Sequence, residues 1–105
     1  MAKGQRVTGT VEGTGAAIDV VCGFTPTHVR VVNWDGVASM EWFTGMGAAG
    51  GYKVVAAGTN SKVTTNGISE YAGVSGVTSN GFTIWADADV NASAETLFWE
   101  ASDES

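Results

Sequence analysis

Basic residues, histidine, cysteine and proline are all scarce in this chain of 105 residues. Lysine and arginine together number five against eleven acidic residues, which gives a net charge of −6. Proteins that bind nucleic acids need a basic surface that displaces counterions from phosphates, so the composition argues against that class. No apolar run approaches the roughly 20 residues that cross a membrane as a helix. The sequence therefore predicts neither a nucleic-acid partner nor a membrane partner.

The single cysteine and the single proline have structural interpretations. One cysteine cannot form an internal disulfide, and Cys22 follows Ile18 and Val20 in an alternating apolar run. We therefore expect a buried structural thiol at this position. Pro26 precedes a predicted strand, where its missing N–H removes no hydrogen bond from a sheet.

Glycine and tryptophan, in contrast, are abundant. Fifteen glycines separate short apolar runs, and this pattern of tight turns is typical of all-β proteins. Apolar residues make up 44% of the chain and charged residues only 15%, so we expect an oligomer or a docked partner that covers apolar surface. We predict one all-β domain over residues 1–105, either an antiparallel β-sandwich of jelly-roll-like form or a small barrel.

The clearest local pattern is a β-hairpin over residues 23–43. Asp35-Gly36 is a favoured two-residue type I′ turn, because glycine accepts the positive φ that this turn requires. The turn sets Arg30 opposite Glu41, which predicts an opposite-charge pair on the wetter face. The other face is the predicted core and carries Val29, Val31, Met40 and Trp42.

Further strands are predicted by the same alternation, at residues 5–12, 16–22, 52–57, 61–65, 74–79, 82–85 and 95–101. Asn80-Gly81 predicts a second hairpin that sets Val77 opposite Ile84. Residues 92–102 are the nearest candidate for a helix, although a β-rich context often overrides weak helical propensity. We expect a flexible arm at residues 1–6, a flexible loop at residues 45–51 and a solvated tail at residues 102–105.

Two motifs invite a ligand-binding interpretation. Residues 45–50 match the G-x-G-x-x-G pattern, but a strand follows them instead of the helix that phosphate binding needs. Asp87, Asp89 and Asn91 place oxygen atoms on alternate residues, as Ca²⁺ loops do, although the glycine and the bidentate glutamate of such loops are missing. A polar turn capped by its own side chains is the alternative. We predict no cofactor, and these three residues are the weak candidates for a metal.

His28, the only histidine, does not suggest catalysis. A catalytic histidine needs a nucleophile beside it, and the sequence sets His28 opposite Phe43, with neither Cys22 nor a serine paired to it. The sequence therefore predicts a protein without enzymatic activity.

The four tryptophans divide between core and surface. Trp42 and Trp99 share a face with aliphatic residues and are expected to be buried, whereas Trp34 and Trp85 lie on the opposite faces of their hairpins. Trp34 and Trp85 are therefore candidates for contact with a partner subunit. A sugar-stacking platform is the alternative role for the tryptophans.

Four other residues are candidates for partner contact. Phe98 lies on the face opposite its apolar neighbours, so its strand is expected to be covered by both the core and a partner. Met46 lies in the glycine-rich loop. Lys3 and Arg6 form the only basic pair, which could bind acidic residues of a partner.

A set of turn and strand motifs extends over the whole chain. They are Gly13-Thr14-Gly15-Ala16-Ala17-Ile18, Gly23-Phe24-Thr25-Pro26, Val29-Arg30-Val31-Val32-Asn33, Glu41-Trp42-Phe43 with Gly45-Met46, Gly81-Phe82-Thr83-Ile84, Ala86-Asp87-Ala88-Asp89-Val90-Asn91 and Glu95-Thr96-Leu97-Phe98-Trp99. With these motifs the sequence resembles a family of small, glycine-rich structural proteins of tailed bacteriophages. The motifs form turns and strand cores, so they indicate a fold family more firmly than a place in the particle.

The resemblance implies a component of the virion that is made in the cytoplasm of the bacterial host. It suggests a capsid decoration (cement) protein, which binds the major capsid protein on the outer face of the head as a homotrimer and stabilises the head. A head-fibre or tail-associated module that touches host surface glycans is the alternative.

Overall fold

Eight antiparallel strands run through the chain in the computed structural model, which describes residues 5–71 and 80–103. No helix forms in that described part, so the prediction of an all-β fold is confirmed and the helix considered for residues 92–102 is absent. The strands are β1 (Gln5–Glu12), β2 (Ile18–Val21), β3 (His28–Asn33), β4 (Ala38–Phe43), β5 (Gly50–Val54), β6 (Asn60–Tyr71), β7 (Gly81–Ile84) and β8 (Thr96–Asp103).

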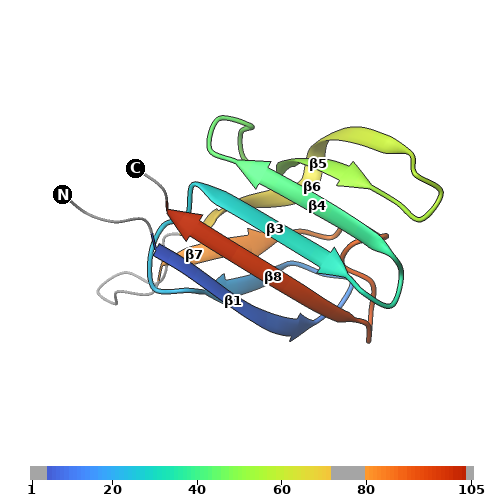
Figure 1. The fold of residues 1–105 in the computed structure, drawn as a ribbon, viewed down its shortest axis with the longest axis horizontal. Coiled ribbons are helices and arrows are strands. Elements are labelled where there is room, and N and C mark those ends of the chain that lie inside the picture. The colour runs from blue at the N-terminus through green and yellow to red at the C-terminus, as the bar shows by residue number, and fades with distance from the viewer. Residues whose placement is uncertain (1–4, 72–79, 104–105) are drawn as a thin grey trace.

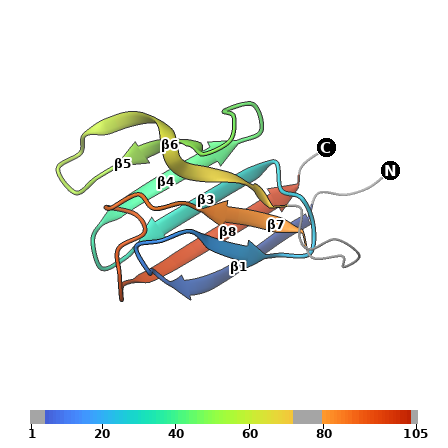
Figure 2. The same ribbon diagram turned by 180° about the vertical axis from the view of Figure 1, so that it is seen from behind.

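The strands form one sheet that curls into a half-barrel. Their order across the sheet is β1-β8-β3-β4-β5-β6-β7-β2. β1, β8, β3 and β4 form the layer that faces the viewer in Figure 1, and β6 and β7 lie behind it, as the reversed view in Figure 2 shows. Within the described residues the two ends of the order, β1 and β2, do not pair with each other, so the half-barrel stays open along that seam.

The hairpin of β3 and β4 has the predicted register but a different turn. All six pairs match the expected register, and the last of them joins Asn33 to Ala38. Residues 34–37 therefore form a four-residue turn, in which Val37 has the positive φ of 54°, so the prediction of a type I′ Asp-Gly turn is wrong. The physical reason lies in Asn33, whose Oδ1 accepts a hydrogen bond from Gly36 N at 2.9 Å and closes the longer turn.

β6 is one bent strand of twelve residues, of which the sequence predicts only residues 61–65. Its first half pairs with β5 from Asn60 to Val63, and after a register shift Ile68 pairs with Gly50. Its second half pairs with β7 from Ile68 onward. The bend contains Asn66, with a φ of 61°, and Gly67, where a Cβ would lie 2.2 Å from the carbonyl oxygen of Gly50. The Asn-Gly pair thus redirects the strand from the β5 ladder to the β7 ladder and does not reverse the chain.

The glycine-rich loop between β4 and β5 is anchored to its surroundings. Met46 N donates a hydrogen bond to Phe43 O at 3.0 Å, and the indole N–H of Trp42 donates to Gly47 O at 3.0 Å. β5 begins at Gly50, the last residue of the glycine pattern, so the pattern opens a strand and offers no helix N-terminus to a phosphate. The loop expected to be flexible therefore has defined attachments.

β7 lies between β2 and β6. Ile84 pairs with Ile18 of β2 on one side and with Ile68 of β6 on the other. The hairpin partner predicted for β7, at residues 74–79 with Val77, lies outside the described residues. In the part that is described, both edges of β7 are occupied by other strands.

β1 has its predicted bounds, residues 5–12, so the arm predicted at residues 1–6 overlaps it, whereas β8 extends beyond its predicted end. β1 begins at Gln5, and Arg6 pairs with Ser102, so Arg6 belongs to the sheet and not to a free arm. β8 runs to Asp103, which places Ser102 in the sheet and not in a solvated tail. β1 and β8 pair with each other along their whole length. Because the two strands are far apart in the sequence, the local pattern of either one does not predict this pairing.

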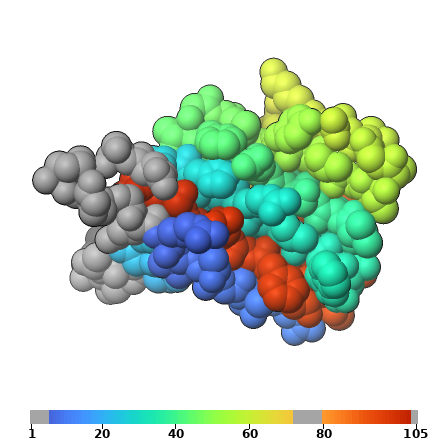
Figure 3. Space-filling model, in the orientation of Figure 1, coloured from blue at the N-terminus to red at the C-terminus, as the bar shows by residue number. Residues whose placement is uncertain are grey.

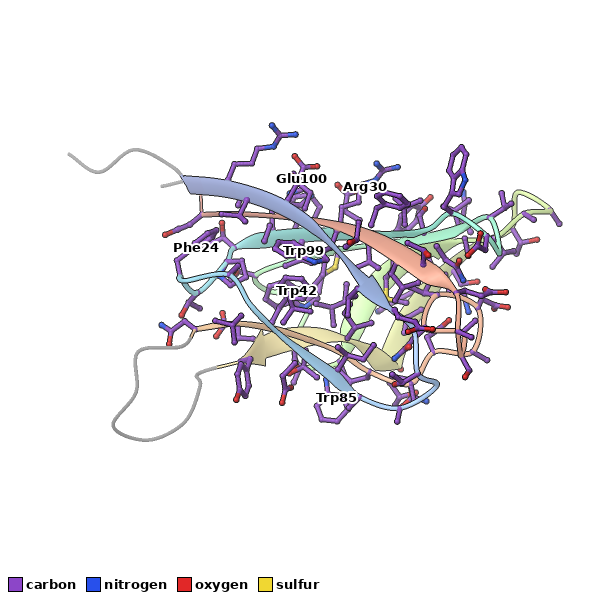
Figure 4. All side chains as sticks on the ribbon, turned by 90° about the horizontal axis from the view of Figure 1, so that it is seen from below. Phe24, Arg30, Trp42, Trp85, Trp99 and Glu100 are labelled. Atoms are coloured by element: carbon purple, nitrogen blue, oxygen red, sulfur yellow. The ribbon has the colours of Figure 1, made fainter. Side chains whose placement is uncertain are left out.

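The core lies between the layers and contains the expected tryptophans. Trp42, 3% exposed, and the partly buried Trp99 both lie between the layers (Figure 4). Trp99 packs edge-to-face on Phe82 with 5.4 Å between ring centroids. Gly9 of β1 makes room for Trp99, since a Cβ there would come within 2.7 Å of the indole ring. The thiol of Cys22 is partly buried beside this core, and burial raises its pKa. The other buried apolar residues are Val20, Phe24, Val29, Val31, Ala38, Met40, Ile68, Ile84, Val90, Leu97 and Ala101.

Candidate interaction surface

The turn between β3 and β4 projects two apolar side chains into solvent. Trp34 is 72% exposed and Val37 is 63% exposed, the two largest values among the big apolar residues of the described part. Val37 lines a shallow hollow together with Val32 and Val54 on the outer face of the front layer. Neighbouring exposed apolar side chains of this size mark surfaces that a partner covers.

Hydrogen bonds from the buried Asn33 and from Asp35 hold this turn in place. Asn33 is fully buried, and its Nδ2 donates hydrogen bonds to Asp89 O at 2.9 Å and to Glu95 Oε1 at 2.8 Å. Asp35 Oδ2 accepts a hydrogen bond from Thr96 N at 3.0 Å. The turn is therefore attached both to the loop before β8 and to β8 itself, and a partner would not have to order it on binding.

The backbone of Val37 is strained. A φ of 54° lies in the left-handed region, which a β-branched residue occupies at a cost of roughly 1–3 kcal/mol. Glycine or asparagine would occupy this position with less strain. A strained backbone that exposes an apolar side chain is a feature found at binding sites, and here it coincides with the exposed Trp34.

Phe98 of β8 continues the apolar surface beside the turn. It is 47% exposed and lies opposite Val32 of β3. A surface hollow of about 320 Å³ lies beside it and is lined also by β1, Arg30 and Glu100. We call Trp34, Val37 and Phe98 the apolar corner; the layer that carries it faces the viewer in Figure 3.

The charges beside the apolar corner are arranged differently from the prediction. Arg30 lies opposite Glu41 in the register, but Glu41 Oε2 lies 2.7 Å from His28 Nε2 instead. In residues 5–71 and 80–103, Arg30 makes no ion pair, so the predicted pair with Glu41 is wrong. His28 competes successfully because it occupies the diagonal position on the same face, within reach of the carboxylate. The guanidinium of Arg30 is thus available beside Phe98.

His28 contacts an acid, a serine and an aromatic ring. Its Nε2 contacts Glu41, its Nδ1 lies 3.5 Å from Ser102 Oγ, and its ring stacks obliquely on Phe43 at 4.5 Å. The sequence pairs no serine with His28, but in the folded chain Ser102 of β8 lies beside it. Ser102 lies in the sheet between Arg6 of β1 and His28 of β3, and its 3.5 Å separation from the ring is at the limit of a hydrogen bond. The arrangement provides a polar contact across three strands.

Trp85 lies on the other side of the molecule. It is 38% exposed, and its indole N–H donates a hydrogen bond to Ser69 Oγ at 2.7 Å. Figure 4 shows it directed away from Trp42 and Trp99 and from the side that carries Arg30 and Glu100. The exposure predicted for Trp34 and Trp85 is confirmed, but they lie on opposite sides, so one flat partner surface cannot cover both.

The remaining predicted contact residues are dispersed. Met46 is 42% exposed and lines a separate hollow with Tyr52 and Val63. Arg6 is exposed on β1 and forms an ion pair with Glu100, close to the Phe98 hollow. Lys3 lies outside the described residues. Of the predicted set, the structure therefore brings Trp34, Phe98 and Arg6 to one layer.

The candidate metal ligands are occupied by protein groups. Lys53 Nζ donates to Asp87 at 3.0 and 3.2 Å and to Asp89 at 2.9 Å, so an ammonium group takes the place suggested for a cation. Asn91 is buried elsewhere, where it accepts from Thr14 N at 3.0 Å and donates to the Trp85 carbonyl at 2.9 Å. No cluster suited to a metal occurs among the residues that the structure describes. The loop is a polar turn, because Asp87 Oδ1 also accepts from the amides at 89 and 90.

The environment of Lys53 stabilises the protonated, positively charged form of its side chain. Burial is the largest single influence and would lower its pKa, but hydrogen bonds and Coulombic attraction from Asp89 and Asp87 outweigh it, so the pKa lies above its ordinary value. Lys53 and Asp87 have side chains only 16% and 10% exposed, whereas Asp89 is 56% exposed. The cluster fixes the loop whose Asp89 carbonyl supports Asn33, and through it the apolar corner.

Comparison of the chain with protein-family models, with curated proteins and with solved structures finds no match in any of the three. Among the described residues, no helix is long and apolar enough to cross a membrane. The identification of this surface therefore rests on its exposed side chains, on the contacts that hold them, and on the resemblance of the sequence motifs.

Proposed function

We propose that this chain is a non-enzymatic structural protein of a phage virion, a capsid decoration protein that binds the outer face of the major capsid protein lattice and stabilises the head. The observation that carries the proposal is the apolar corner. Trp34, Val37 and Phe98 are 72%, 63% and 47% exposed on a turn and strand that buried hydrogen bonds hold in position.

The chemistry of the apolar corner favours adhesion to a protein surface. Aromatic side chains dominate the binding energy of protein interfaces when a partner fully desolvates them. Arg30 and the pair Arg6–Glu100 lie beside Phe98 and would form a charged rim around an apolar centre. Because a capsid repeats the same contact many times, the affinity of each site can be modest. The homotrimer that the resemblance implies remains a prediction.

The test uses purified particles of the phage that encodes the chain. We expect mass spectrometry to detect the chain in particles and electron microscopy to place it on the head. Particles that lack it, or that carry it only on tails, would falsify the proposed location. Binding of added protein to particles lacking it should weaken about thirtyfold for Trp34→Ala, since a central aromatic contributes about 2 kcal/mol.

A control variant on the opposite side of the molecule tests which surface binds the particle, independently of whether the chain is a decoration protein. Trp85→Ala removes the same kind of side chain from the opposite side and should bind particles as the unmodified chain does. Loss of binding in Trp85→Ala with retention in Trp34→Ala would leave the decoration role intact but move the contact to the rear layer. Circular dichroism of both variants confirms that the fold is unchanged.

A head-fibre or tail-associated module that touches host glycans is the second candidate function. Trp85 favours it, because its exposed ring is fixed by a hydrogen bond to Ser69 and would present a flat face to a sugar. A glycan array should then show saturable binding that is lost in Trp85→Ala or Trp34→Ala with folding intact. An array without saturable binding by the unmodified chain excludes this candidate.

A further inference from the structure

β1 is a long edge strand without protection. It has eight residues, it contains no proline, and its register with β8 is continuous, without a bulge. Natural proteins usually shorten, bulge or charge such edges, because an exposed row of backbone N–H and C=O groups pairs readily with another strand. β2, at the other end of the sheet, has only four residues. The edge available for pairing is therefore that of β1.

The pairing with β8 determines which backbone groups of β1 point outward. Gly13 N donates to Glu95 O at 2.8 Å, and Gly13 O accepts from Ala94 N at 2.8 Å, so both groups of Gly13 face the β8 side. Since the direction alternates along an antiparallel strand, the odd-numbered residues of β1 face β8. The free N–H and C=O groups then belong to Arg6, Thr8, Thr10 and Glu12.

Within β1, residues 7–11 form a palindrome centred on Gly9, and residues 6 and 12 flank it. Thr8 and Thr10 flank the glycine, then come Val7 and Val11, and the outermost positions hold Arg6 and Glu12. The two halves are identical except at the outermost pair, where the charges are opposite. Paired antiparallel with a copy of itself about Gly9, this strand would set like residues opposite each other at positions 7–11 and each Arg6 opposite a Glu12.

We infer that a second copy of this chain binds along β1, with the two β1 strands antiparallel about a twofold axis at Gly9. This register sets Thr8 opposite Thr10 of the second copy and Arg6 opposite Glu12 of the second copy. All four positions point their backbone groups outward, so each opposed pair can exchange two hydrogen bonds. A register centred between two residues would set residues whose backbone groups face outward opposite residues whose groups face β8, and the hydrogen bonds between the two copies would be lost.

The side chains complement this register on both faces. Val7 is 37% exposed at the open seam and would lie opposite Val11 of the second copy, so both become covered. Glu12 is exposed and makes no ion pair in the described part of the chain, and it would gain Arg6 of the second copy. Arg6 would then lie between its own Glu100 and that Glu12.

The contact is isologous and closes with two copies. It predicts a dimer in solution, twice the 10.8 kDa of the chain, in place of the trimer that the resemblance implies. The inference does not depend on attachment to a capsid, because β1 pairing and the apolar corner use different side chains.

Sedimentation velocity over a dilution series tests the inference. The unmodified chain should convert from dimer to monomer on dilution. Glu12→Arg turns both charge pairs repulsive and should weaken the dimer about tenfold or more, and Arg6→Glu should act in the same way. An equimolar mixture of the two variants should restore a dimer, because each Arg or Glu of one then faces its opposite on the other. Glu70→Arg makes the same charge change on an exposed position of β6 and should leave the dimer unchanged.

Backbone pairing has its own test. Thr8→Pro removes an outward N–H while leaving the ladder to β8 intact, and it should give a monomer. If that variant does not fold, the charge variants still decide. A monomer at all concentrations, a trimer, or a dimer that Glu12→Arg weakens no more than Glu70→Arg does would each overturn the inference.

Discussion

Replacement of Lys53 by methionine tests how the loop behind the apolar corner is held. Lys53→Met keeps the length and apolar stem of the side chain and removes the ammonium group. Asp87, 10% exposed, would lose its counter-ion at 3.0 Å, and Asp89 would lose its own at 2.9 Å. Two carboxylates would then lie close together without a cation.

The magnitude follows from the burial of each end. Removing one member of a buried pair costs about 3–5 kcal/mol, and an exposed pair contributes about 0.2–1 kcal/mol. The contact with Asp87 resembles a buried pair, but its loss should cost the lower end of that range because two backbone amides still donate to Asp87. The contact with Asp89 resembles an exposed pair. We expect a loss of about 3 kcal/mol, which lowers the melting temperature of a domain of this size by roughly 15 °C.

Calorimetry or urea unfolding measures this loss, with Lys62→Met as the control. Lys62 is exposed on neighbouring β6, so its removal should change stability by less than about 0.5 kcal/mol. The pKa of Lys53 is raised above 10.5 on folding, so the stability from its charge is complete below that pH and is lost as the pH rises through the higher folded pKa. The difference between the unmodified chain and Lys53→Met should therefore shrink at strongly alkaline pH. Equal losses in the Lys53 and Lys62 variants would refute the reasoning.

Three further substitutions give defined outcomes. Val37→Gly removes the strain of a valine at a φ of 54° and should raise the free energy of unfolding by roughly 1 kcal/mol; an unchanged melting temperature would contradict this strain. Trp42→Ala empties a site that is 3% exposed and should cost about 3–5 kcal/mol in urea, while a loss below about 1 kcal/mol would mean that the hairpin faces are inverted. Gly9→Ala places a Cβ 2.7 Å from Trp99 and should cost about 1–3 kcal/mol with altered tryptophan fluorescence; an unchanged spectrum would contradict this contact.

The sequence predicts those parts of the fold that depend on local alternation. Val29, Val31, Met40 and Trp42 lie in the core because a period of two places them on one face, and the register of their hairpin follows from the same alternation. The turn type was wrong, because the deciding contact is the side chain of Asn33, which itself depends on Asp89 and Glu95 far along the chain.

The candidate site was predictable only in part. Trp34 and Phe98 could be assigned to the surface because each alternates with buried neighbours. Val37 gave no signal, because a left-handed valine is recognisable only from its backbone angles. Lys53 lies on a strand 34 residues before Asp87, and no local pattern connects an inward-facing lysine to that loop. Its alternation with exposed Tyr52 was the one available hint that Lys53 faces inward.

The position of β8 has a consequence for synthesis. β8 fits between β1 and β3, and Arg6 meets Glu100 across 94 residues of chain. Until the ribosome has synthesised β8, β1 has no paired strand, and β3 exposes the backbone N–H and C=O groups of one edge. Pairing between such distant segments is slow, so the nascent chain is prone to aggregate until β8 is synthesised and inserts between β1 and β3. Slower translation or a lower temperature during production should therefore raise the soluble yield.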